Sequence, residues 1–223
     1  MSVQLKRAAR YLNSFVKRNF LVLKVNKKEP TFVFHHLPRC GGTSLRRSIM
    51  ENKNVFSDYR IGWGSIYPLK YPLAKLGKND CLCGHFELDG YHLFERYPEI
   101  FCDSRFRLFT FIRNPLDLAI SNYFYRLKKN QEVESNIRDS LLRNNNYLAK
   151  ILNVNIENYK EIMDRYDYIG IVEHYQESLH GLSLFMDCDG LIFNKINGAE
   201  KNEQLDAIKQ EDIDKFKLQN SLD

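Results

Sequence analysis

One short stretch of the chain combines residue types that can bind an anion. Residues 32–49 read "FVFHHLPRCGGTSLRRSI", an apolar run that passes through two adjacent glycines into a helical pattern. Glycines let the backbone approach a phosphate closely, and the amides that begin the following helix point at it. Thr43 and Ser44 supply hydroxyl donors, and Arg39 supplies a fixed positive charge. A tight turn with an ordinary helix cap is the alternative, and the pattern favours phosphate binding.

The same stretch differs from the phosphate loop of nucleoside triphosphatases. The pattern G-x-x-x-x-G-K-[ST] is absent from it. In that loop a lysine reaches the terminal phosphates and a hydroxyl binds magnesium. The sequence therefore disfavours ATP or GTP with magnesium as the ligand, and a nucleotide-dependent kinase stays as a rival interpretation.

Alternating apolar and amphipathic segments predict the elements that hold this stretch. Short apolar runs predict strands at 31–37, 80–86, 106–112 and 167–173. Helices are expected at 43–53, 115–129, 133–153, 156–165, 175–187 and 203–219. Such alternation predicts an α/β fold, P-loop-like and three-layered, with a central parallel sheet covered by helices on both faces. Ligands in these folds bind beyond the carboxyl ends of the strands, where the glycine stretch lies.

Composition and charge limit the classes of protein that the chain can be. Its 223 residues suit one domain, or one with appendages, and 43% hydrophobic with 27% charged residues suits a globular protein. A net charge of +5 favours an anionic ligand but is no nucleic-acid signature. No apolar run approaches the roughly 18 residues that a membrane span needs.

Residues 1–30 form a basic, amphipathic segment. It lacks the continuous apolar region and the cleavage site of a secretory signal. We expect a helix that packs on the domain, with peripheral contact to a membrane surface as the alternative. Five cysteines, an odd number without framework spacing, favour reduced thiols and a cytoplasmic protein. Cys81 and Cys83 are expected in the interior, and no metal site is predicted.

Six segments, in order along the chain, resemble those of the sulfotransferases. "HLPRCGGTSL" resembles the family's 5′-phosphosulfate loop. "FIRNPLDLAISNYFY" is similar to its 3′-phosphate element, an Arg-x-Pro with a serine eight positions after the arginine. Four further segments resemble family patterns: "CGHFELDG", "NNNYLAKIL", "YIGIVEHYQESLHGLSLF" and "NKING". The resemblance is strongest to the carbohydrate sulfotransferases that act on heparan and chondroitin chains, and to their bacterial relatives.

The resemblance implies that the chain uses 3′-phosphoadenosine-5′-phosphosulfate (PAPS) and releases adenosine 3′,5′-bisphosphate (PAP). It implies a PAPS-binding domain at 31–200, with a charged C-terminal helix in 201–223 as part of the same domain. The 5′ end of the nucleotide would lie on six consecutive residues, Arg39, Cys40, Gly41, Gly42, Thr43 and Ser44.

The 3′-phosphate of the nucleotide would lie on Arg113 and Ser121, with Lys195 as a further candidate. A guanidinium can bond two phosphate oxygens at once. Ser121 is about two helical turns after Arg113, so it can face the same ligand only because the arginine precedes the helix. The alternative is that none of the three binds the nucleotide. Arg113 would then be a solvated arginine at a strand end, Ser121 a hydroxyl on a helix face and Lys195 a solvated lysine.

Two residues of the loop depart from the family pattern. Arg39 stands where the family usually has a lysine that contacts the bridging oxygen, and Cys40 replaces the usual threonine. Arginine keeps its charge but is bulkier and cannot shuttle a proton. The exchange either preserves stabilisation of the leaving phosphate or marks a non-catalytic relative that binds a nucleotide or an anionic glycan.

Sulfuryl transfer to a hydroxyl needs an aligned acceptor and a base. A histidine suits this work because its unperturbed pKa is about 6.5. His85, after a strand and beside a glycine, is the first candidate, His36 the second and Glu87 the third; for the histidines a structural role is the alternative. The acceptor implied is a hydroxyl-bearing oligo- or polysaccharide, and no metal is required. The aromatic stretch 58–73 is either a wall for that acceptor or a packed loop.

Overall fold

A sheet of five parallel strands forms the centre of the computed structural model, which describes residues 30–62, 64–131, 134, 136–143, 145–188, 191, 205 and 207–223. The strands are β1 (Thr31–His35), β2 (Asn54–Asp58), β3 (Asp80–Gly84), β4 (Phe106–Ile112) and β5 (Tyr168–Ile171). Their order across the sheet is β2-β3-β1-β4-β5, and each neighbouring pair is parallel. Because the strands run the same way, their carboxyl ends meet at one edge of the sheet.

The apolar runs of the sequence become the two most enclosed strands. Every residue of β1 is buried, as are all but two residues of β4. In register, Val33 of β1 lies between Leu82 of β3 and Leu108 of β4. A strand with neighbours on both sides and helices over both faces meets no water, which is why its sequence is continuously apolar.

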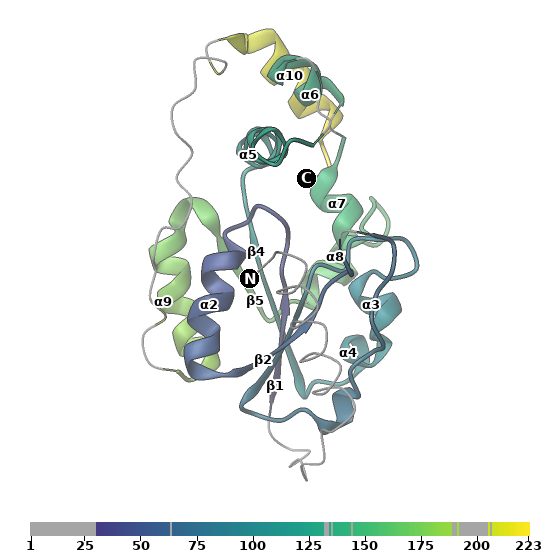
Figure 1. Ribbon diagram of the computed structural model, residues 1–223, viewed down its shortest axis with the longest axis vertical. Helices are drawn as coiled ribbons and strands as arrows, with labels where there is room; N and C mark the ends of the chain where they lie inside the picture. Colours follow the sequence, from purple (N-terminus) through teal and green to yellow (C-terminus); the bar gives the residue numbers. More distant parts are fainter. Residues whose placement is uncertain are drawn as a thin grey trace.

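Helices cover both faces of the sheet (Figure 1). On one face lie α2 (Gly42–Asn52) and α9 (Tyr175–Met186); on the other lie α3 (Leu93–Arg96), α4 (Pro98–Cys102) and α8 (Tyr159–Asp164). Short 3₁₀ turns occur at Leu73–Lys75 (η1) and Val172–His174 (η2). The predicted three-layer α/β fold with a central parallel sheet is confirmed. Within the described ranges, no helix combines the length and the apolar character needed to cross a bilayer.

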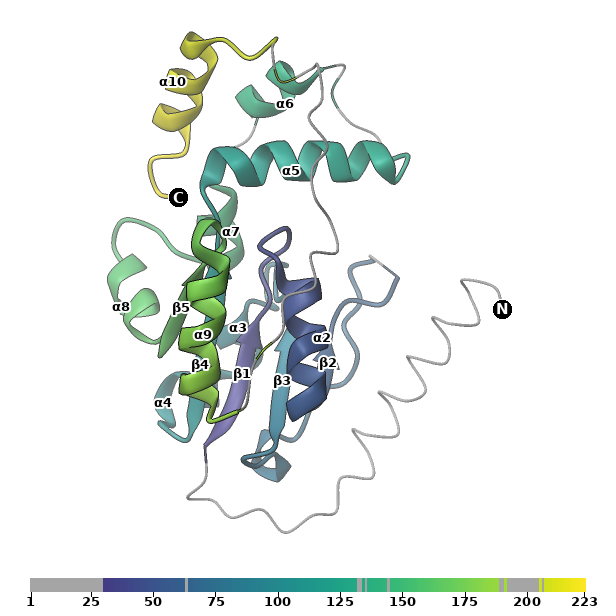
Figure 2. The same cartoon turned by 90° about the vertical axis from the view of Figure 1, so that its left-hand side faces the viewer.

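A helical cap lies above the carboxyl edge of the sheet and consists of α5 (Pro115–Lys128), α6 (Ile137–Arg143) and α10 (Gln210–Gln219). Figure 2 shows α5 lying across that edge, with α6 and α10 beyond it. The Asn114 side chain accepts hydrogen bonds from the amides of Leu116 and Asp117, so α5 starts with a favoured cap and a proline. The cap has a small core of its own, formed by Ala119, Tyr123, Ile137, Leu141 and Phe216.

Several elements differ from those expected from the sequence. The sequence does not predict β2, whose residues "NVFSD" begin two positions after the last residue of α2, nor the short helices α3 and α4. The expected helix 133–153 is two helices, α6 and α7 (Tyr147–Leu152), and Asn146 between them has a φ of 45°. Asparagine tolerates this left-handed conformation, which interrupts a helix. The expected basic helix at 1–30 lies outside the described residues apart from Pro30, and the division into domains stays a prediction.

Candidate functional site

The glycine loop follows β1 directly and leads into the first turn of α2. Gly41, the residue before α2, has a φ of 73°, which glycine adopts readily. A side chain at this position would also collide with Tyr175, since a Cβ would lie 2.6 Å from its ring, and the Tyr175 hydroxyl donates to the Gly41 carbonyl at 3.1 Å. The first amides of a helix have no partner within it. The amides of Gly42, Thr43 and Ser44 therefore begin α2 as donors at the carboxyl edge of the sheet.

His36 lies beneath this loop and fixes its shape. A Cβ on Gly42 would lie 2.0 Å from the His36 ring, so only glycine fits against the imidazole. His36 is buried, and its Nδ1 is 2.8 Å from the Tyr59 hydroxyl. Burial lowers the pKa of His36 well below its ordinary value of 6.5, so the ring is neutral at neutral pH. The second candidate base is thus a buried support of the loop.

The Arg39 side chain reaches α5 in the cap. Its Nε and Nη2 donate to the Ser121 hydroxyl at 3.2 and 3.0 Å, although the two residues are 82 positions apart. The guanidinium carbon lies 4.5 Å from the centre of the Tyr125 ring. Arg39 itself has a φ of 66°, a conformation that residues with a side chain rarely adopt and that is often found at functional sites.

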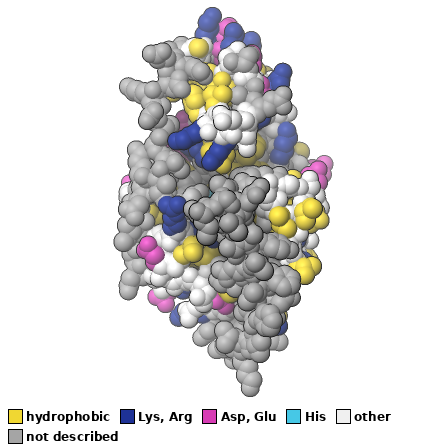
Figure 3. All heavy atoms as spheres, viewed as in Figure 1, with side chains coloured by type: hydrophobic (Ala, Val, Ile, Leu, Met, Phe, Trp, Pro, Cys, Tyr) yellow, Lys and Arg dark blue, Asp and Glu magenta, His cyan; other side chains and the backbone are white. Residues whose placement is uncertain are grey.

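Arg113 makes a second contact between its own segment, which also contains Ser121, and the glycine loop. It follows the carboxyl end of β4, and its Nη1 donates to the Arg39 carbonyl at 3.4 Å. The turn after it is fixed by Glu173, whose carboxylate accepts from the Asn114 amide at 2.8 Å. Loop 39–44, Arg113 and Ser121 therefore gather at one place on the sheet edge. Lys and Arg side chains also gather between the cap and the body in the space-filling view (Figure 3).

His85 and Glu87 follow β3 on the same edge of the sheet. The His85 ring centre lies 4.6 Å from that of His36, and its Nδ1 is 3.4 Å from the Glu87 carboxylate. Glu87 also forms an ion pair with Arg60. Burial alone would raise the pKa of Glu87, but the hydrogen bond and charge of His85 and the charge of Arg60 outweigh it and lower that pKa. The Glu87 carboxylate is therefore charged at neutral pH and orients His85.

The chain was compared as a whole with protein families, curated proteins and solved structures. No family model matches the chain, and no curated protein matches its sequence. The chain is similar to a sulfotransferase from Alicyclobacillus acidocaldarius, with a TM-score of 0.48, 16% identity, and coverage of 86% of this chain and 96% of that one. It is also similar to mouse sulfotransferase SULT7A1 complexed with PAP, with a TM-score of 0.45, 13% identity, and coverage of 79% and 63%.

The remaining predicted residues have varied surroundings. Cys40 is buried, and burial raises the pKa of its thiol to about 12, so it stays protonated. Thr43 is exposed and Ser44 is half-buried. Lys195 lies outside the described residues. Among the described residues, no three His, Cys, Asp or Glu side chains are grouped as metal ligands would be.

The structure adds four residues that lie in segments noted in the sequence but are not singled out individually there: Tyr59, Arg60, Tyr125 and Tyr147. Burial raises the pKa of Tyr147, at the start of α7, and the charge of the nearby Glu87 raises it further. Tyr125 lies four residues after Ser121, and that spacing places both on one helix face. Tyr59 and Arg60 directly follow β2, so recognition of that strand would have placed them at the sheet edge.

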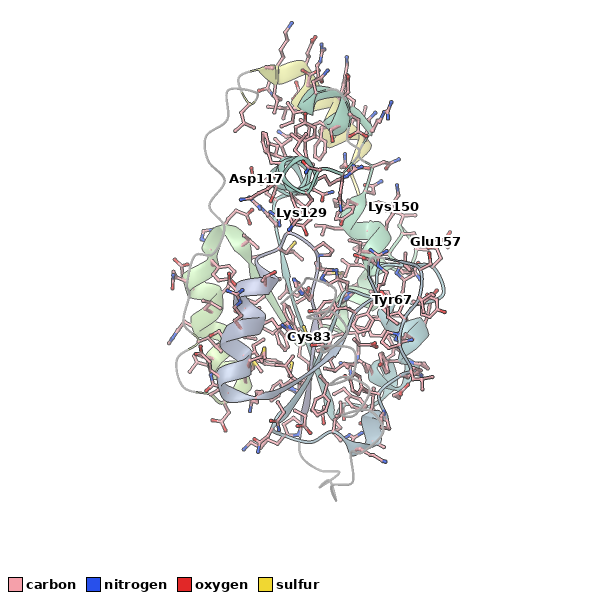
Figure 4. All side chains as sticks on the ribbon, in the orientation of Figure 1. Tyr67, Cys83, Asp117, Lys129, Lys150 and Glu157 are labelled. Atoms are coloured by element: carbon pink, nitrogen blue, oxygen red, sulfur yellow. The ribbon has the colours of Figure 1, made fainter. Side chains whose placement is uncertain are left out.

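The tyrosines of the aromatic stretch 58–73 pack against the rest of the protein. Tyr59 is half-buried, Tyr67 and Tyr71 are buried, and the Tyr67 hydroxyl accepts from the Glu87 amide at 3.3 Å. Figure 4 shows Tyr67 on the side of the molecule opposite α2 and α9, with Cys83 within the sheet. Tyr67 thus supports the Glu87 backbone. Among the described residues of the stretch, the exposed apolar ones are Ile61, Ile66 and Leu69.

Proposed function

We propose that the chain is a sulfotransferase that transfers the sulfuryl group of PAPS to a hydroxyl of an acceptor, a carbohydrate. The observation that carries the proposal is the contact of Arg113 with the backbone of the glycine loop, at the carboxyl edge of a parallel sheet. PAPS carries anionic groups at its 5′ and 3′ positions, so it needs two adjacent sets of donors. Loop 39–44 with the start of α2 is one set, and Arg113 with Ser121 is the other.

The residues present fit such a ligand. Neither Gly41 nor Gly42 leaves room for a side chain, so the backbone itself lines the loop. The amides that begin α2 suit the 5′-phosphosulfate, and the guanidinium of Arg113 suits two oxygens of the 3′-phosphate. Arg39 is charged and within reach of both sets, because its carbonyl contacts Arg113 and its side chain contacts Ser121.

His85 is the base in this proposal. During transfer the acceptor oxygen bonds to sulfur, the bond from sulfur to the bridging phosphate oxygen breaks, and its electron pair stays on the departing PAP. His85 takes the acceptor proton, and the charged Glu87 orients the ring and stabilises the imidazolium that forms. Arg39 neutralises the charge that grows on the leaving phosphate, for which it must leave Ser121.

The test is transfer of radiolabelled sulfate from PAPS over a panel of polysaccharides, oligosaccharides and small alcohols. We expect label in a carbohydrate with the parent protein and loss of that label with Arg113→Ala. Transfer to a small alcohol alone would contradict the carbohydrate acceptor. Absence of transfer throughout, with PAP still bound, would contradict the enzymatic proposal.

A non-catalytic nucleotide-binding protein is the second candidate, favoured by one observation. Arg39, in place of the expected lysine, contacts Ser121 and Tyr125 on α5. If these contacts persist with nucleotide bound, the arginine cannot reach the leaving group. A third possibility, a nucleotide kinase, is tested by a thermal-shift comparison of PAP with ATP and magnesium, in which we expect only PAP to stabilise the chain.

A further inference from the structure

One face of α5 holds the Arg39 guanidinium through two different kinds of contact. The edge of the group that carries Nε and Nη2 faces the Ser121 hydroxyl, at 3.2 and 3.0 Å. The planar group also lies over the Tyr125 ring, with its carbon 4.5 Å from the ring centre. Ser121 and Tyr125 are four residues apart on the helix and therefore neighbours on its surface.

Other positive charges lie near the Arg39 guanidinium and disfavour its own charge. Burial lowers the pKa of Arg39, and the charge of Arg113 lowers it further. The ammonium of Lys129 lies 5.8 Å from the centre of the same Tyr125 ring, and Figure 4 shows Lys129 beneath α5. A cation placed beside other cations needs a compensating attraction, and the electron-rich face of an aromatic ring supplies one. The ring thus explains why Arg39 rests on α5.

We propose that Tyr125 is a positioning residue, which holds Arg39 on α5 until a sulfuryl group draws the guanidinium away. The proposal rests on the proposed function, because it concerns the two ends of the same nucleotide. PAP lacks the sulfuryl group, so Arg39 can stay on Tyr125 when PAP binds. PAPS binding requires Arg39 to leave the Tyr125 ring. Loss of that contact reduces the net binding free energy of PAPS.

Arginine suits this role better than lysine. A guanidinium is planar and weakly hydrated, so it can lie flat on a ring while one edge donates hydrogen bonds to a hydroxyl. An ammonium has three N–H donors but no planar group, so it cannot stack on the ring while it presents two donors from one edge to the same hydroxyl. The presence of arginine at position 39 and of tyrosine at position 125 is therefore one linked feature of the site.

The experiment measures dissociation constants for PAP and PAPS by calorimetry in the full chain and in substituted chains. In Tyr125→Leu we expect the PAPS affinity to rise relative to PAP by about 3- to 10-fold, the size of a partly buried cation–π contact. Tyr125→Phe keeps the ring face and should stay within about twofold of the parent. Tyr159→Leu removes an exposed tyrosine of α8, away from the site, and should change neither constant.

A second comparison separates positioning from a structural role. In an Arg39→Met background, Tyr125→Leu should leave the ratio of the two constants unchanged, since no guanidinium is left to hold. If Tyr125→Leu unfolds, Tyr125→Met is measured instead, because its flexible side chain fills the space without a ring. An unchanged ratio in the Arg39 parent, or an equal change in the Arg39→Met background, would overturn the role of Tyr125 alone. Failure of the parent to bind either nucleotide would overturn it together with the proposed function.

Discussion

The imidazole of His36 lies against the Cα atom of Gly42, so that a Cβ built on Gly42 would stand 2.0 Å from Cδ2 of the ring. His36 cannot withdraw easily, because it is buried and hydrogen-bonded to Tyr59. The residue after β1 thus determines which residue can begin α2. The shape of the anion loop depends on this pair as much as on glycine's backbone freedom.

Gly42→Ala should therefore destabilise the chain by about 1–3 kcal/mol, the usual range for overpacking a buried contact. Chemical denaturation measures this change, and PAP binding should weaken with it. Gly64→Ala is the matched control, since a Cβ there would meet one backbone oxygen, that of Ile61, at 3.3 Å, a much milder contact than the 2.0 Å at Gly42. In a His36→Ala background the penalty of Gly42→Ala should fall to less than half; the full penalty in that background would refute the steric cause.

Arg113→Ala should weaken PAP binding about 10- to 100-fold, because a charge-assisted and potentially bidentate contact is lost. Isothermal calorimetry gives the two dissociation constants. Arg107→Ala is the control, since Arg107 lies on the same strand and pairs with Asp167 by a long, partly exposed contact. Equal affinities in parent and Arg113→Ala would remove this arginine from the site.

His85→Ala should lower turnover about 100- to 10,000-fold while PAP affinity changes little, since loss of a general base affects the reaction rather than nucleotide binding. Rates come from the label-transfer assay with the best acceptor of the panel. His180→Ala, an exposed histidine of α9, serves as control. If His85→Ala had the same turnover rate as the parent, the base would have to be another group.

Glu87 predicts a specific dependence of stability on pH. Its pKa is lowered from 4.5 in the folded chain, so the folded state favours the charged carboxylate. The stabilisation is present above pH 4.5 and is lost as pH falls through the lower folded value. Glu87→Gln should cost about 1–3 kcal/mol at pH 7, and the gap to the parent should narrow in acid. Melting temperatures from pH 7 to pH 3 measure the gap; a constant gap would contradict the charged state.

The sequence predicts local features of this protein well and long-range contacts poorly. Continuous apolar runs predict β1 and β4, because enclosed parallel strands need them. The strand β2 escapes prediction because it is short, lies at an edge, and carries Asn54, Ser57 and Asp58. The position of β2 follows from its pairing with β3, and this pairing cannot be inferred from the local sequence.

The same limit applies to the site. The loop and Arg113 are recognisable because their residue types sit in short motifs. That Arg39 contacts Ser121, and that Arg60 pairs with Glu87, depends on the side-chain directions of segments far apart in the sequence. The resemblance implied that Arg39 serves the 5′ end of the nucleotide. In the structure its side chain lies on α5, against Ser121 and Tyr125 of the segment that resembles the 3′-phosphate element.

The central claim is that loop 39–44 and Arg113 hold the two ends of one adenine nucleotide. Its most direct test is calorimetric titration of the parent chain with PAP and with adenosine 5′-monophosphate, which lacks the 3′-phosphate. The account predicts one site per chain and at least about tenfold tighter binding of PAP, since each phosphate adds charge-assisted hydrogen bonds. Equal affinities for the two nucleotides, or no binding of PAP, would contradict it.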